Sequence, residues 1–177
     1  MKSIIATALL AATTYGYNLI SMPQAPQPTT HDEADFVAGF IYGMTGINDL
    51  YEIENCFVES KEMTMWLELA VGDLEKGGWD NETQAALEFG MALLILPQTL
   101  TTCTGMDDEI AAIEEWATIF QDPTKLAATI SKNYLLHKKK IDADRAAVEA
   151  DLAAEDYFQC GVDTAQLATD AIGPINV

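Results

Sequence analysis

Two mostly apolar stripes, each containing a cysteine, constrain the fold of this chain most strongly. Both stripes recur at spacings of three and four residues, which places each set on one face of a helix. Residues 77–81, which begin with two glycines, interrupt the pattern between them. We therefore predict a helical hairpin with its turn at these glycines. The stripes are Ile53, Cys56, Ser60, Met63, Leu67, Ala70 and Leu74, followed by Ala86, Phe89, Leu93, Leu96, Leu100 and Cys103.

The two arms of this hairpin have nearly equal predicted lengths. A helix from Cys56 to Lys76 would span about 30 Å, and one from Glu82 to Cys103 about 32 Å, at ~1.5 Å per residue. Antiparallel helices of matched length return Cys103 to the level of Cys56, and both cysteines lie on the inward stripes. We therefore predict a disulfide between Cys56 and Cys103, which would stabilise the fold by roughly 4 kcal/mol through loop closure.

The third cysteine, Cys160, has no partner in this scheme. An odd cysteine in a secreted protein is either a free thiol or a link to another chain. We expect a buried free thiol at Cys160, with an intermolecular thiol as the alternative.

The N-terminus has the pattern of a secretory signal. Lys2 is followed by an apolar run at residues 4–12 and by small residues up to Gly16, so we predict a signal peptide at residues 1–16. The alternative is a retained amphipathic helix. The run is far shorter than the roughly 20 residues that span a bilayer. No other segment is longer and as apolar, so we expect no membrane insertion of the mature chain.

The remaining pattern completes an all-α fold in a single domain. Residues 17–32 carry three prolines and are expected to form an extended arm or linker, and residues 33–177 the helical bundle. The first helix contains Gly39 and Gly43 one turn apart. Because glycine weakens a helix, we expect a neighbouring helix to approach closely there. Helices predicted at about 123–154 and 157–172 form a second hairpin. The result is a five- or six-helix bundle of two hairpins plus an N-terminal helix.

Three segments carry residues in a pattern that matches a known family. These residues are Phe36, Gly39, Phe40 and Gly43 with Asp49, Leu50, Ile53 and Cys56; Leu96, Pro97, Leu100 and Cys103; and Leu135, Leu136, His137, Ile141, Asp142, Asp156, Tyr157 and Gly161. With them the chain resembles a family of small secreted all-helical proteins of unknown function predicted in ciliates. The resemblance implies a secreted bundle and supports the Cys56–Cys103 bond, and it implies no activity. Two departures are the three lysines after His137, where the family has glycine and tyrosine, and the additional Cys160.

The net charge of −19 makes nucleic acid a poor partner, because phosphate binding needs clustered basic residues. We predict no catalytic residues, no metal site and no cofactor, since the chain has only two histidines and lacks phosphate-binding or nucleophile motifs. The acidic stretch at residues 31–35 is read as a solvated helix start, with loose cation binding as the alternative. His137 lies on an apolar stripe and is expected to be packed in the core.

The hairpin turn carries the sequon Asn81-Glu82-Thr83, so Asn81 is a predicted glycosylation site. Asn81 or Asp80 is also the expected N-cap of the second arm. We expect a secreted structural or interaction protein, not an enzyme, that self-associates into an extracellular surface layer or fibre, with glycans as further partners. The alternative is a secreted carrier of an apolar ligand in the bundle core, because tryptophans and methionines at helical spacing can line a cavity.

Overall fold

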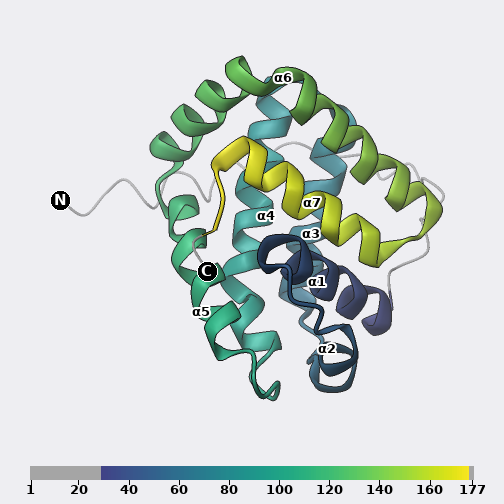
Figure 1. The fold of residues 1–177 in the computed structure, drawn as a ribbon. Coiled ribbons are helices and arrows are strands. Elements are labelled where there is room, and N and C mark those ends of the chain that lie inside the picture. Colours follow the sequence, from purple (N-terminus) through teal and green to yellow (C-terminus); the bar gives the residue numbers. More distant parts are fainter. Residues whose placement is uncertain (1–28, 176–177) are drawn as a thin grey trace, which may run out of the picture.

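The computed structural model describes residues 29–175, except for the side chains of Thr30 and Trp79. The predicted signal peptide and most of the predicted arm therefore lie outside the described residues. Within them the chain forms seven α-helices and one 3₁₀ turn, without a strand (Figure 1). No helix in this part of the chain is long and apolar enough to cross a membrane. The helices are α1 Thr30–Thr45, α2 Leu50–Cys56, α3 Lys61–Lys76, α4 Trp79–Thr99, α5 Asp107–Ala117, α6 Pro123–Ala154 and α7 Tyr157–Ile172, with the 3₁₀ turn η1 at Thr118–Gln121.

Two hairpins, α3–α4 and α6–α7, form the body of the fold, as the sequence pattern predicts (Figure 1). The helix count is seven instead of five or six because the first arm is not continuous. Helix α2 ends at Cys56, and α3 begins only at Lys61. Ser60 has extended backbone angles, and its Oγ accepts a hydrogen bond from the backbone N–H of Met63 at 3.3 Å. This N-cap explains the break that the stripe of apolar residues does not reveal.

The disulfide between Cys56 and Cys103 is confirmed, with 5.1 Å between the two Cα atoms. Its setting differs from the prediction, because Cys56 is the last residue of α2 and Cys103 lies in the turn after α4. Two hydrogen bonds flank it: the N–H of Val58 donates to the Thr99 carbonyl at 2.8 Å, and the Thr102 hydroxyl donates to the Cys56 carbonyl at 2.6 Å. The disulfide therefore ties the α2–α3 connection to the end of α4.

Helix α1 begins slightly earlier than the predicted domain boundary at residue 33. Thr29 caps it in a reciprocal arrangement with Asp32, in which each side chain accepts a hydrogen bond from the other residue's backbone N–H. Such a capping box fixes the start of a helix. Residues 30–32, assigned to the arm by the sequence pattern, are therefore the first turn of α1.

Helices α1 and α7 cross so closely that their backbones leave no room for a side chain at the glycines of the crossing. A Cβ atom added to Gly39 would lie 1.9 Å from the carbonyl oxygen of Phe158, and one added to Gly161 would lie 2.2 Å from that of Phe36. At Gly43 a Cβ atom would lie 2.6 Å from the Cβ of Ala165. The predicted close approach at Gly39 and Gly43 is thus confirmed, and Gly161 supplies the complementary surface on α7.

The prediction that His137 packs in the core is wrong. His137 is exposed, and its backbone angles (φ −124°, ψ 19°) are not helical, so α6 bends there. The bend turns the preceding residues outward, and the side chains of Leu135 and Leu136 are 83% and 66% exposed. The spacing of apolar residues predicts the burial of His137 wrongly, because residues before and after a bend no longer lie on one face of the helix.

A test of the α1–α7 crossing compares two helical glycines. We expect Gly161→Ala to lower the free energy of unfolding by at least about 2 kcal/mol, because the methyl group must displace backbone atoms of α1. The control is Gly72→Ala, where an added Cβ meets nothing within 4 Å. This change should raise stability by about 0.5–1 kcal/mol through helix propensity alone. Urea unfolding followed by circular dichroism measures both, and equal effects at the two sites would contradict the crossing.

Candidate functional site: an apolar cavity between the hairpins

A cavity of about 550 Å³ lies between the two hairpins and is here called the inter-hairpin cavity. Residues from α1, α3, α4, α6 and α7 line it, together with Phe120 of η1. Its volume falls within the range of about 300–1,000 Å³ that small-molecule sites occupy. The apolar lining includes Phe36, Leu67, Leu74, Phe89, Ile130, Ile141, Leu152 and Leu167.

The cavity follows from how the helices pair. Helices α3 and α4 pack on each other, α6 packs on α7, and α7 packs on α1, whereas α4 and α6 approach at few positions. Where the hairpins face each other, several lining positions are small residues, such as Ala85 and Ala86 of α4 and Ala168 and Ala171 of α7. Methyl groups cannot fill the space between helices held apart by their other contacts, so a volume remains.

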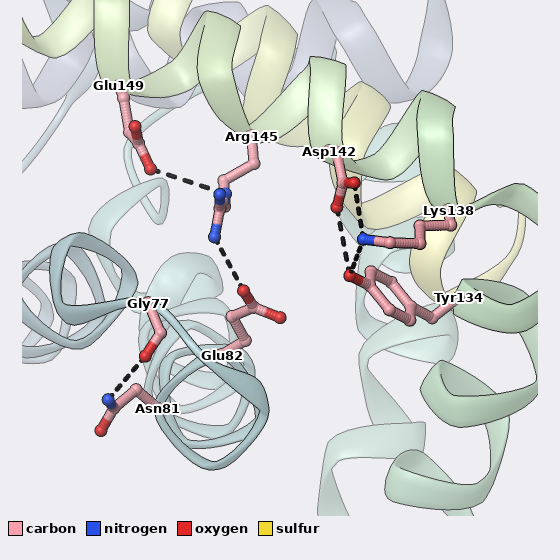
Figure 2. Close-up of polar contacts among 8 residues, drawn as sticks. All are labelled: Gly77, Asn81, Glu82, Tyr134, Lys138, Asp142, Arg145 and Glu149. Atoms are coloured by element: carbon pink, nitrogen blue, oxygen red, sulfur yellow. Dashed lines mark hydrogen bonds and ion pairs between the residues drawn. The ribbon is translucent and has the colours of Figure 1, made fainter.

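An ion pair between two lining residues joins the two hairpins. Arg145 of α6 points toward α4, and its Nη1 lies 2.7 Å from Oε1 of Glu82 (Figure 2). On the other side its Nε lies 3.6 Å from a carboxylate oxygen of Glu149, too far for a hydrogen bond. The positive charge of Arg145 is therefore already engaged by carboxylates of this chain.

A second cluster of polar side chains on α6 consists of Tyr134, Lys138 and Asp142, two of which line the cavity. The ammonium group of Lys138 lies 2.7 Å from Asp142 and 2.5 Å from the hydroxyl of Tyr134, which itself lies 3.2 Å from Asp142 (Figure 2). These hydrogen bonds raise the pKa of Lys138 to about 12 and lower the pKa of Asp142. Tyr134 and Asp142 line the cavity, and Lys138 holds both from the solvent side.

A buried carboxylate lies in the wall formed by α1. Glu33 is only 6% exposed, and its Oε1 accepts a hydrogen bond from the Thr64 hydroxyl of α3 at 2.6 Å. Its other oxygen, Oε2, is buried without a hydrogen-bond partner in the described structure. Burial raises the pKa of Glu33, the hydrogen bond from Thr64 lowers it, and the nearby Glu59, Glu68 and Asp32 raise it further.

The side chains that line the cavity carry a net negative charge. The described residues that line the cavity include six acidic side chains but a single basic one, Arg145. Since Arg145 is paired with Glu82, the potential at the cavity favours cations and opposes anions. The six acidic residues are Asp32, Glu33, Glu68, Glu75, Glu82 and Asp142.

Cys160 also lines the cavity, and the structure places it as a free thiol that is 1% exposed. Burial raises the pKa of the Cys160 thiol to about 12, with smaller contributions from Asp151, Asp163 and Asp156. Because disulfide exchange requires an accessible thiolate, this thiol is poorly placed for a bond to another chain.

Asn81 lies in the first turn of α4, next to Glu82 (Figure 2). The predicted cap at Asn81 or Asp80 is wrong, because Gly78 is the N-cap and no side chain bonds to the free N–H groups there. Instead the Asn81 amide donates to the carbonyl of Gly77 at 2.8 Å. The side chain is half-buried, and glycosylation of Asn81 stays a prediction.

A group of three metal-ligating side chains lies apart from the cavity lining, although we predicted no metal site. His31 Nδ1 is 3.2 Å from a carboxylate oxygen of Asp35 and 3.8 Å from one of Glu54. Their ligand atoms all lie within 4.8 Å of one another, so they could hold a metal ion through one nitrogen and two oxygens. The cation-binding alternative for residues 31–35 already includes His31 and Asp35, but Glu54 belongs to α2, so the local sequence does not reveal the third side chain.

Two pairs of aspartates join α6 and α7, with Asp144 beside Asp170 and Asp151 beside Asp163. In each pair the two carboxyls are close enough to share a proton. The pKa of Asp144 and that of Asp151 are each raised to about 6. Burial is the larger cause, and the carboxyl of the partner aspartate is the next. Lys140 lies 2.7 Å from Asp170, and the pKa of Asp170 is lowered, so the proton of that pair stays on Asp144. These pairs hold the hairpin together best when one member is protonated.

The sequence pattern does not single out Glu33 or Arg145. Glu33 reads as part of a solvated acidic helix start, yet it precedes Phe36 by three residues and Phe40 by seven, which places it on the apolar stripe. That spacing is the signal that could have found it. Arg145 has no comparable signal, because its partner Glu82 lies in the other hairpin.

Comparison with known proteins gives one match. A family model described as SctB-like, secreted protein B-like, matches residues 17–170, which is most of the chain. No curated protein matches the chain, and neither does any solved structure. The match agrees with the predicted secreted family, while the ciliate origin in the resemblance stays a prediction.

The aspartate pairs predict a pH-dependent hairpin. Because the folded-state pKa of Asp144 lies above the model-peptide value of about 3.9, the folded state binds more protons, and its stability falls as pH rises from about 4 to 6. Besides Asp170, the groups that influence Asp144 are Lys140 on α6 and Asp163 on α7. Asp144→Asn keeps a hydrogen-bond donor at every pH and removes the repulsion of two ionised carboxylates.

We therefore expect Asp144→Asn to raise the melting temperature by about 2–4 °C near pH 7.5, for a gain of about 1 kcal/mol after solvent screening. Near pH 5 the gain should fall to about half, and it should approach zero only near pH 4 and below, where the carboxyl of the unfolded chain is protonated as well. The control is Glu114→Gln, an exposed residue of α5, which should give the same small effect at both pH values. A gain from Asp144→Asn that does not depend on pH would refute the shared proton.

Proposed function

Because the chain belongs to the secreted protein B-like family, we propose that it acts outside the cell as a carrier of an apolar ligand. The inter-hairpin cavity is the binding site in this proposal. The observation that carries it is a cavity of about 550 Å³ whose lining is mainly apolar and comes from both hairpins and α1. The role is binding without catalysis.

Three features support this proposal. The family match begins at residue 17, directly after the segment predicted as a signal peptide. The Cys56–Cys103 disulfide suits an oxidising extracellular setting and braces the α3–α4 wall of the cavity. A cavity of this size lined by apolar groups gains free energy when it is filled, since its lining otherwise lacks contact atoms.

The first test is binding of a neutral apolar probe, dodecanol, measured by isothermal titration calorimetry on the full chain below the aggregation limit of the probe. We expect saturable binding by the wild type. Ala168→Phe places a large ring in the cavity lining and should weaken binding at least about tenfold by occupying the site. The matched control, Ala143→Phe, changes an exposed position of α6 outside the lining and should leave binding unchanged.

Native mass spectrometry of the secreted protein complements this test, because a copurifying apolar molecule would be seen directly. If Ala168→Phe unfolds, the smaller Ala85→Leu replaces it, since Ala85 lines the cavity from α4. Absence of saturable dodecanol binding by the folded wild type would reject the carrier function.

Self-association into an extracellular layer or fibre is the second candidate. The exposed pair Leu135 and Leu136, adjacent at the bend of α6, favours it, because large apolar side chains exposed together often mark contact surfaces. Glycosylation at Asn81 is compatible with either function.

Size-exclusion chromatography with light scattering tests this second candidate. We expect concentration-dependent association of the wild type and its loss in Leu135→Ser/Leu136→Ser, because the apolar contact area is removed. A double change at exposed positions elsewhere, Glu114→Gln/Glu115→Gln, is the control. A wild type that stays monomeric at high concentration counts against assembly.

A further inference from the structure

We propose that the inter-hairpin cavity selects amphiphiles with a cationic amino head, and that Glu33 binds this head. This inference rests on the proposed carrier function and adds the chemical class of the ligand. A protonated long-chain amine combines the required parts, an apolar tail for the cavity and a compact cation with several N–H donors.

The first argument is the incomplete environment of Glu33. Its side chain is more than nine-tenths buried and lines the cavity, yet Oε2 has no hydrogen-bond partner in the described structure. Leaving a buried carboxylate oxygen unpaired costs free energy, and native proteins generally satisfy such groups. Thr64 satisfies only Oε1. Oε2 itself is closed to solvent, so a ligand donor in the cavity would reach this carboxylate after a turn of the Glu33 side chain and would then complete its coordination.

The second argument is the charge around Glu33. Glu59, Glu68 and Asp32 are close enough to raise its pKa, so the negative potential extends beyond a single carboxylate. No basic residue appears among the groups that act on Glu33. A cation placed there would be attracted by several acids at once and would hold Glu33 in its ionised form.

The same surroundings disfavour the other head groups. A fatty-acid carboxylate would meet a negatively charged lining. Glu82 and Asp142 are balanced by Arg145 and Lys138, but four further acids and no further basic residue line the described part of the cavity. An uncharged hydroxyl could donate one hydrogen bond to Glu33 but would leave its charge without a counter-ion. Both head groups can donate a charge-assisted hydrogen bond to the carboxylate. Only the amine also neutralises the buried negative charge, so it should bind more tightly than the alcohol.

The experiment compares three probes of equal tail length by calorimetry near neutral pH: dodecylamine, dodecanol and dodecanoate. For the wild-type chain we expect dodecylamine to bind about tenfold more tightly than dodecanol, because only the amine supplies a counter-charge to Glu33, and dodecanoate to bind weakest. Glu33→Gln keeps the size of the side chain and an acceptor for Thr64 while removing the charge. This variant should lose most of the preference for dodecylamine over dodecanol.

Glu88→Gln is the matched control. Glu88 is also 6% exposed and also has an unpartnered Oε2, but it does not line the cavity. Its substitution should leave the preference for the amine intact, and circular dichroism melts of both variants show whether each is folded.

The outcomes separate this inference from the carrier function. If none of the probes binds, the carrier function itself fails. If dodecanol binds but dodecylamine binds no more tightly, or if Glu33→Gln keeps the preference, the cavity is a carrier site and the role of Glu33 is overturned. If Glu33→Gln does not fold, the relative affinities of the three probes for the wild-type chain test the preference for a cationic head group.

Discussion

The structure depends on the contact between α1 and α7, where Gly39 and Gly161 bring two helix backbones together. Any side chain at either position would push the helices apart, because the nearest atoms belong to the opposing backbone and cannot rotate away. This contact attaches the α6–α7 hairpin to α1. Helix α1 in turn reaches the other hairpin through side chains, with Phe40 against Phe89 of α4 at 5.2 Å and Glu33 bonded to Thr64 of α3.

The cavity is a consequence of this indirect attachment. The hairpins are positioned by α1 on one side and by Arg145 and Glu82 on another, and small residues face each other between these supports. A fold in which the hairpins packed directly on each other would have closed the space. Polar groups are confined to particular points of the lining, which is how binding sites combine an apolar volume with a few orienting contacts.

The helical periodicity of the sequence predicts much of the fold, but it does not predict most of the residues of the candidate site. The all-α class, both hairpins, the disulfide and the extent of α7 are readable because stripes at three- and four-residue spacing record which face each helix buries. The break at Ser60 and the bend at His137 escape that reading, since caps and bends interrupt a helix without changing its composition. Glu54 and Arg145 gain their significance from partners on other helices, and single-sequence patterns carry no information about such pairs. For Glu33 the stripe spacing indicates burial but does not identify its partner Thr64.

The Arg145–Glu82 ion pair differs in kind from the other contacts that position the hairpins. Partly exposed ion pairs contribute only about 0–1 kcal/mol and weaken as salt screens them. The disulfide joins the end of α2 to the turn after α4, and the glycine crossing joins α1 to α7, so both contacts stay intact when this pair opens. Salt therefore loosens the link between α4 and α6, while the contacts that hold the rest of the fold do not depend on ionic strength.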